Sequence, residues 1–136
     1  MQKTIEAEEF RLVDSRGNLR ARLGIQDEQT LLELRTVAGR LALEIGAGPK
    51  GIAAVRIYDE SSNRPRIELS IDAQGSHVHF AGGESQQSYL FLKNTGASGV
   101  VLTDSKGTRK AEVLVSAEGN ASIAVWDSTG AMKNLT

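Results

Sequence analysis

Apolar and polar residues alternate with a period of two along most of this 136-residue chain. The stretch from Phe10 to Leu23 shows the pattern best, with apolar residues at positions 10 and 12, a short polar segment, and apolar residues again at 19, 21 and 23. Successive side chains of a β-strand point to opposite faces, so the alternation predicts strands with one apolar face. The segment Asp14-Ser-Arg-Gly17 between the two runs predicts a hairpin turn, because aspartate initiates turns and glycine adopts positive φ near their end.

Similar units recur along the whole chain. Anchored on the position of Asp14, they lie at positions 14, 36, 59, 82, 104 and 127, a step of 22 or 23 residues. Apolar residues stand two and four positions before each anchor. The expected turn residues are Asp14, Gly17, Gly39, Asp59, Asp104, Gly107, Asp127 and Gly130. A fixed step of this size indicates tandem repeats.

Six tandem hairpins of 22 or 23 residues predict a single all-β domain over residues 1–136, with about twelve short strands and a lead-in over residues 1–8. The expected architecture is a β-prism or a solenoid-like body, with a β-trefoil as the alternative. In these architectures the apolar faces enclose one core. We therefore expect Phe10, Leu12, Leu19 and Leu23 to be buried.

Composition narrows the functional classes. Lys and Arg total 16 against 17 Asp and Glu, a balance that predicts no nucleic-acid partner. The chain has no cysteine, which excludes disulfides and zinc–thiolate sites. No apolar run reaches the ~18 residues that a membrane span needs, and no signal-peptide pattern is present. We expect a cytoplasmic protein, with export by a non-classical route or a phage-like assembly left open.

The first unit carries a recognisable pattern, Leu12-x-Asp-x-x-Gly17-x-x-Arg-Ala-x-Leu23. It resembles the L-x-D-x-x-G-x-x-R-A-x-L units of a class of uncharacterised bacterial tandem β-hairpin repeat proteins. The fifth unit keeps much of the pattern from Leu102 to Ala111, whereas the second and fourth units lack the aspartate. The resemblance implies a bacterial origin and a repeat architecture, and it transfers no functional residue.

His77 and His79 are the only histidines. Residues two apart share one face of a strand, so the two imidazoles are placed to chelate one metal ion. The repeat pattern directs Val78 and Phe80 to the apolar face and both histidines to the opposite face. The alternative is a pair of solvated strand histidines.

Four other outward residues are candidates for ligand or partner binding. Tyr58 and Trp126 occupy equivalent positions, one residue before an anchor, and exposed aromatics are typical of carbohydrate and protein interfaces. Arg11 and Arg56 are also equivalent to each other and suit an anion or a partner. The alternative for the arginines is ion pairing on a solvated face with Glu9, Glu33, Glu44 and Glu68.

No catalytic set emerges, since no Gly-x-Ser-x-Gly occurs and both histidines lie in one strand. We expect a non-enzymatic structural module without a cofactor that assembles with copies of itself, a trimer being favoured. This expectation rests on the regular repeat and on Ala54, Val101, Leu114 and Ala124, which place apolar residues on the second face of their strands. The alternative is a lectin-like or protein-binding module whose exposed aromatics contact an unknown glycan or protein.

Overall fold

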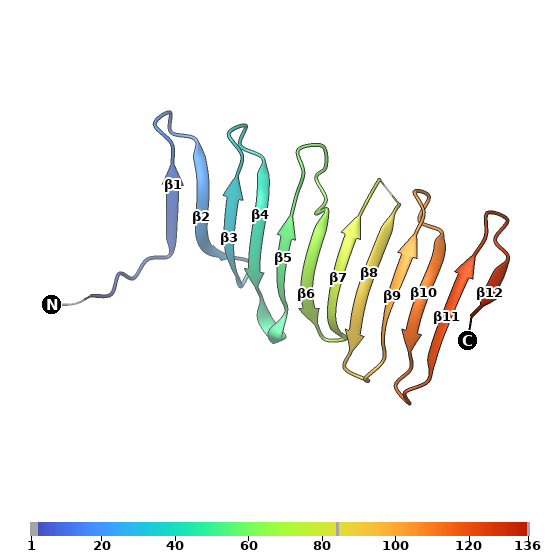
Figure 1. Ribbon diagram of the computed structural model, residues 1–136. Helices are drawn as coiled ribbons and strands as arrows, with labels where there is room; N and C mark the ends of the chain where they lie inside the picture. Colours follow the sequence, from blue (N-terminus) through green and yellow to red (C-terminus); the bar gives the residue numbers. More distant parts are fainter. Residues whose placement is uncertain (1–2, 84, 136) are drawn as a thin grey trace.

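The computed structural model describes residues 3–83 and 85–135, and these form one antiparallel sheet of twelve strands. Each strand pairs with the next one along the chain (Figure 1). The strands are β1 (Glu9–Val13), β2 (Leu19–Gln26), β3 (Gln29–Arg35), β4 (Leu41–Ala47), β5 (Ala53–Ile57), β6 (Ile67–Asp72), β7 (Gly75–Ala81), β8 (Gln87–Lys93), β9 (Ser98–Thr103), β10 (Arg109–Val115), β11 (Ala121–Trp126) and β12 (Met132–Asn134). The expected all-β chain of six tandem hairpins is confirmed.

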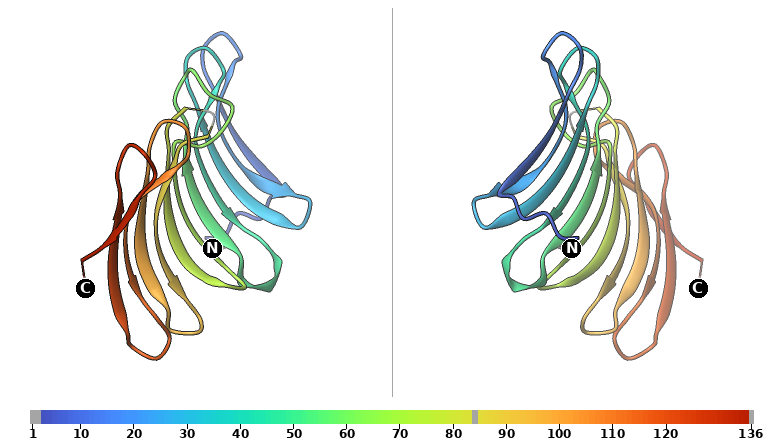
Figure 2. Two further views of the ribbon diagram at one scale, coloured as in Figure 1. Left: turned by 90° about the vertical axis from the view of Figure 1, so that its right-hand side faces the viewer. Right: turned by 90° about the vertical axis from the view of Figure 1, so that its left-hand side faces the viewer.

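The sheet is open, and its two edges are β1 and β12. Seen from either end, the strands are bent and the sheet is twisted (Figure 2). The alternative of a β-trefoil is wrong, because all twelve strands pair in sequence order within one sheet. The six hairpins therefore do not surround a core within the chain.

Helical structure in the described residues is limited to η1 (Pro49–Gly51), a 3₁₀ turn that connects β4 to β5. The described part of the chain contains no helix with the length and apolar character to cross a membrane. Residues 3–8 of the expected lead-in precede β1 without regular structure, and residues 1 and 2 lie outside the described residues.

The hairpin turns explain the repeated aspartate and glycine. The Asp14 amide donates to the Asn18 carbonyl at 3.0 Å, and the Gly17 amide donates to the Asp14 carbonyl at 2.9 Å. Gly17 has φ of 82°, a conformation that glycine adopts without steric cost. The same pair of closing bonds recurs at the anchors 36, 104 and 127. At position 36 a threonine replaces the aspartate. Its Oγ1 accepts the Arg40 amide at 3.2 Å, so this turn is kept without a carboxylate.

Strand register gives the sheet two different faces. One face, the apolar face, has a row of paired residues running across eleven strands: Phe10, Leu23, Leu32, Ile45, Val55, Leu69, Val78, Leu90, Val100, Val113 and Ile123. The other face, the polar face, has the adjacent row: Arg11, Arg22, Glu33, Glu44, Arg56, Glu68, His79, Tyr89, Val101, Glu112 and Ala124. The expected alternation is thus kept in register from strand to strand.

Candidate functional site

The apolar face is exposed in the single chain. Leu12 is 64% exposed and Phe10 is 47% exposed, and Leu23 is exposed as well. Large apolar side chains are also exposed elsewhere on this face: Ile25, Leu34, Ile45, Ile57, Leu69, Ile71, Phe80, Leu90, Leu92, Val100, Leu102, Val113 and Ile123. The expectation that Phe10, Leu12 and Leu23 are buried is therefore wrong for the chain by itself. The described residues form one layer and provide no second layer to cover the apolar face. Leu19, the fourth residue of that expectation, is half-buried.

The most buried side chains lie on the polar face instead. Val101 is only 2% exposed, and Ala54 and Ala124 are also buried. Tyr89 and Glu112 flank Val101 on the neighbouring strands. Arg109 donates to Glu112 Oε2 at 2.6 Å and to the Tyr89 hydroxyl at 3.5 Å. Long polar side chains thus lie along the sheet and exclude water from the small residues between them.

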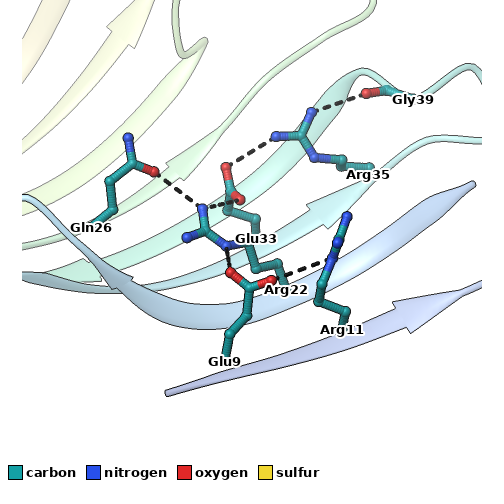
Figure 3. Close-up of polar contacts among 7 residues, drawn as sticks. All are labelled: Glu9, Arg11, Arg22, Gln26, Glu33, Arg35 and Gly39. Atoms are coloured by element: carbon teal, nitrogen blue, oxygen red, sulfur yellow. Dashed lines mark hydrogen bonds and ion pairs between the residues drawn. The ribbon is translucent and has the colours of Figure 1, made fainter.

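Ion pairs link the first three strands of the polar face (Figure 3). Arg22 Nε donates to Glu9 Oε2 at 2.8 Å, and Arg22 Nη1 lies 3.6 Å from Glu33 Oε2. Arg35 Nη2 donates to the other oxygen of Glu33 at 3.2 Å. Arg11 Nε lies 3.4 Å from Glu9 Oε1. Glu33 is 8% exposed, and its two arginine partners explain how a buried carboxylate is tolerated.

Arg56 occupies the centre of a second ionic group. Its Nη1 donates to Glu44 at 2.7 Å and its Nε donates to Glu68 at 2.5 Å. Burial acts to lower the pKa of Arg56, and the hydrogen bonds to Glu44 and Glu68 outweigh it and raise that pKa. The carboxylates that the sequence pattern offered as alternative partners are thus in contact with Arg56, Arg22 and Arg11, and the charges are largely compensated within the chain.

His77 and His79 lie in the middle of the polar face, as the repeat pattern predicts. Their rings are stacked with centroids 4.7 Å apart. His79 lies opposite Glu68 on β6 and opposite Tyr89 on β8. Donor atoms of Glu68, His77 and His79 all lie within 4.8 Å of one another. Desolvation lowers the pKa of His79, and the neighbouring His77 lowers it further.

Aromatic rings continue from the histidines onto β8. The His79 and Tyr89 centroids are 5.6 Å apart, and those of Tyr89 and Phe91 are 6.0 Å apart. Lys93 Nζ lies 5.7 Å from the centroid of the Phe91 ring. The histidines are therefore part of a half-buried aromatic group rather than isolated on a solvated strand.

A polar hollow of about 870 Å³ adjoins this group where β6 begins and β7 ends, and residues of the β5–β6 and β7–β8 connections line it as well. Its lining includes Glu68, His79, Arg66, Gly82 and Gln86. Arg66 is fixed at its rim by Asp59 (Nε–Oδ2, 2.8 Å) and by the Gly82 carbonyl. The hollow gives solvent and small ions access to one side of the Glu68–His79 pair.

Sequence reasoning identified the two histidines but missed Glu68 as their neighbour. The signal was present in the tight turn between β6 and β7, where Asp72 pairs with Gly75. Counting outward from that pair in an antiparallel hairpin places residue 68 opposite residue 79. Tyr89 lies opposite His79 as well, but the connection between β7 and β8 is longer, so this neighbour could not be counted from a tight turn.

The two aromatic candidates are not brought together. Tyr58 follows β5 and Trp126 ends β11, so the topology places them six strands apart, or roughly 29 Å at ~4.8 Å per strand. Both side chains are half-buried. Burial raises the pKa of Tyr58, as does the Glu44 carboxylate. The candidates Tyr58 and Trp126 thus do not form one shared site.

The described residues thus present three features on one sheet: an exposed apolar face, a polar face with compensated charges, and a Glu–His–His group. Comparison of the sequence with protein-family models and with curated proteins finds no match.

Proposed function

We propose that this chain is a non-catalytic structural module that assembles with copies of itself through its apolar face, most simply as a trimer. One observation carries the proposal: a continuous apolar face runs across the sheet, and no other described part of the chain covers it. A fold normally buries the apolar side of a sheet against a second layer. Here that layer has to come from outside the described residues.

The area of the face supports a stable interface. The exposed large apolar residues of the apolar face are on average about half exposed. At ~100 Å² of apolar surface per large side chain, their exposed apolar area is on the order of 800 Å². The largest exposed apolar patch of a typical monomer is about 300–600 Å². A standard protein interface buries about 800 Å² per partner. The face therefore has the size of an interface.

The width of the face favours a second copy as its cover. Twelve strands spaced ~4.8 Å apart extend over roughly 55 Å. A helix or a short peptide would cover only part of that width. A copy of the same sheet has the same width and the same repeat of apolar rows, so it can match the face along its full extent.

Three copies suit the dimensions of the strands. A strand of six residues is about 20 Å long. In a triangular body with sides of ~20 Å, each side lies about 6 Å from the centre, a distance that leucine and phenylalanine side chains fill. The twist of the sheet also favours winding about a common axis over two flat faces in contact. A two-sheet sandwich is the alternative geometry.

Measurement of mass in solution tests the proposal. Light scattering or native mass spectrometry at micromolar concentration should give three times the chain mass of 14.6 kDa. Leu69→Glu places a charge in the centre of the apolar face and should give monomers. Val37→Glu is the matched control, because Val37 is 75% exposed in a turn outside the face, and it should leave the mass unchanged.

A monomer at micromolar concentration would contradict self-assembly. A dimer would support assembly through the face but contradict the three-fold body. An oligomer that persists in Leu69→Glu would show that another surface holds the copies together. The lectin-like alternative is less well supported, because Tyr58 and Trp126 do not share a site.

A further inference from the structure

The group on the polar face has the composition of a metal site. Glu68 from β6 lies opposite His79 of β7, and His77 lies two residues before His79 on the same face. All three residues are half-buried, and their donor atoms lie within 4.8 Å of one another. We propose that Glu68, His77 and His79 bind one divalent transition-metal ion of the zinc type.

The geometry requires only a small adjustment of side chains. Zinc–ligand bonds to imidazole nitrogen and carboxylate oxygen are about 2.0–2.2 Å, so donor atoms around a tetrahedral ion are ~3.4 Å apart. The present separations must therefore close by no more than roughly 1.4 Å. Rotations about the side-chain bonds of three residues supply that movement. The paired strands hold the three Cα positions, so the backbone need not move.

Hydrogen bonds from neighbouring side chains orient the Glu68 carboxylate for metal binding. Arg56 Nε binds Oε2 of Glu68, whereas Oε1 accepts the Ser70 hydroxyl at 3.1 Å. We assign Oε1 to the ion, with Arg56 acting on the other oxygen as an outer partner that orients the carboxylate. Arg56 also binds Glu44, so its charge stays compensated when Glu68 shares its own with the ion.

The donor set selects the kind of ion. Two imidazole nitrogens favour zinc, copper, nickel or iron over magnesium or calcium, which prefer oxygen ligands alone. Three protein ligands leave at least one coordination position for water. The polar hollow beside Glu68 and His79 gives that water a place.

The first test uses untagged, chelator-treated wild-type protein, because these are the only histidines in the chain. Calorimetric titration with ZnCl₂ should show one saturable ion per chain. Nitrogen-15 spectra of the histidine side chains should show both imidazoles shifting together on addition of Zn²⁺. Because one chain supplies all three ligands, the stoichiometry per chain should be the same for a monomer and an oligomer, so this test is independent of the proposed assembly.

Variants identify the ligands. His77→Gln and His79→Gln should each weaken Zn²⁺ binding by at least about tenfold, and the double variant should abolish it. Glu68→Gln should also weaken binding by about tenfold or more. Glu44→Gln is the matched control: it removes the other carboxylate from Arg56 but contributes no ligand, so affinity should change less than about threefold.

Three results would overturn the site: no saturable binding to the wild type, imidazole resonances that do not respond to Zn²⁺, or equal weakening by Glu44→Gln and Glu68→Gln. The last result would mean that the ion responds only to the general charge of the face. The imidazole spectra of the wild type decide the question even if a histidine variant fails to fold.

Discussion

Phe91 lies directly opposite Gly99 across β8 and β9, and its ring occupies the space that a side chain at position 99 would need. A Cβ at Gly99 would lie 3.1 Å from Cε1 of Phe91 and 2.6 Å from Cδ2 of Leu114 on the other side. It would also lie 2.7 Å from the Val113 carbonyl oxygen. The absence of a side chain at Gly99 thus allows two large neighbours to cover the strand between them.

Gly99→Ala and Gly99→Val should therefore destabilise the sheet. Overpacking of this kind costs about 1–3 kcal/mol, which exceeds the ~0.5–1 kcal/mol that replacing a strand glycine with alanine contributes. The free energy of unfolding in urea measures the effect. Gly83→Ala is the control, since a Cβ there meets no atom within 4 Å, and it should be nearly neutral. A stable Gly99→Val protein would show that Phe91 and Leu114 can move aside.

The turn aspartates should make the protein sensitive to acid. Asp14 Oδ1 accepts the Arg16 and Asn18 amides, and Asp104 Oδ1 accepts those of Lys106 and Thr108. The backbone bonds from Asn18 and Thr108 are the main cause that lowers the pKa of Asp14 and Asp104. Each folded-state pKa therefore lies below the unfolded value, about 3.9. Their stabilisation is complete above that value and is lost as the pH falls through the folded-state pKa.

Thermal midpoints measured from pH 7 to pH 2.5 check this sensitivity. Asp104→Asn keeps an acceptor at the turn but does not titrate, so the acid-induced decrease in the midpoint should be smaller than in the wild type. Thr36→Asp should make the acid-induced decrease in the midpoint larger than in the wild type, because it adds a carboxylate to a turn that already has the same backbone geometry. Acid profiles that are identical in all three proteins would contradict the assigned role of the turn carboxylates.

Glu33→Ala should destabilise the first half of the sheet. The substitution leaves Arg22 and Arg35 without their shared carboxylate in a part of the polar face where Glu33 itself is buried. Loss of hydrogen bonds to a buried charged group costs about 1–3 kcal/mol. Urea unfolding measures the change, and Glu60→Ala at an exposed position is the control, for which less than about 0.5 kcal/mol is expected. Equal effects would indicate that the ion pairs contribute little.

The repeat and the separation of faces could be predicted from the sequence because they depend on local periodicity. Asp14, Gly17 and the alternating residues around them are sufficient to place a hairpin and to assign Arg11 and Leu12 to opposite faces. Which face is buried depends on what covers it, and that is a property of tertiary structure or of assembly. Val101 illustrates this point: it lies on the polar face, yet it is only 2% exposed, with Tyr89 and Glu112 beside it on the neighbouring strands.

In the candidate site, too, contacts within one strand were predictable and contacts between strands were not. His77 and His79 are adjacent on one strand, so their proximity follows from strand geometry alone. Glu68 joins them only through the register of the β6–β7 hairpin, which a tight two-residue turn determines. The contact of His79 with Tyr89 depends on the next hairpin, whose connection is longer and whose register is harder to count.

Substitutions on the two faces should distinguish an isolated sheet from an assembled one. Val101→Ala removes a buried side chain in either case and should cost about 2 kcal/mol. Leu90 on the apolar face is 49% exposed in the single chain, so Leu90→Ala should cost less than about 0.5 kcal/mol if that face stays in water. If copies of the chain cover the face, the same substitution creates a cavity and should cost about 2–5 kcal/mol per chain.

Thermal unfolding of both variants at several protein concentrations separates these cases. In an assembled protein, the midpoint of the wild type should rise with concentration, because association stabilises the folded state by mass action. Leu90→Ala should lower the midpoint at every concentration by more than Val101→Ala does. A small effect of Leu90→Ala together with a concentration-independent midpoint would mean that the apolar face remains exposed, and the proposed assembly through it would have to be abandoned.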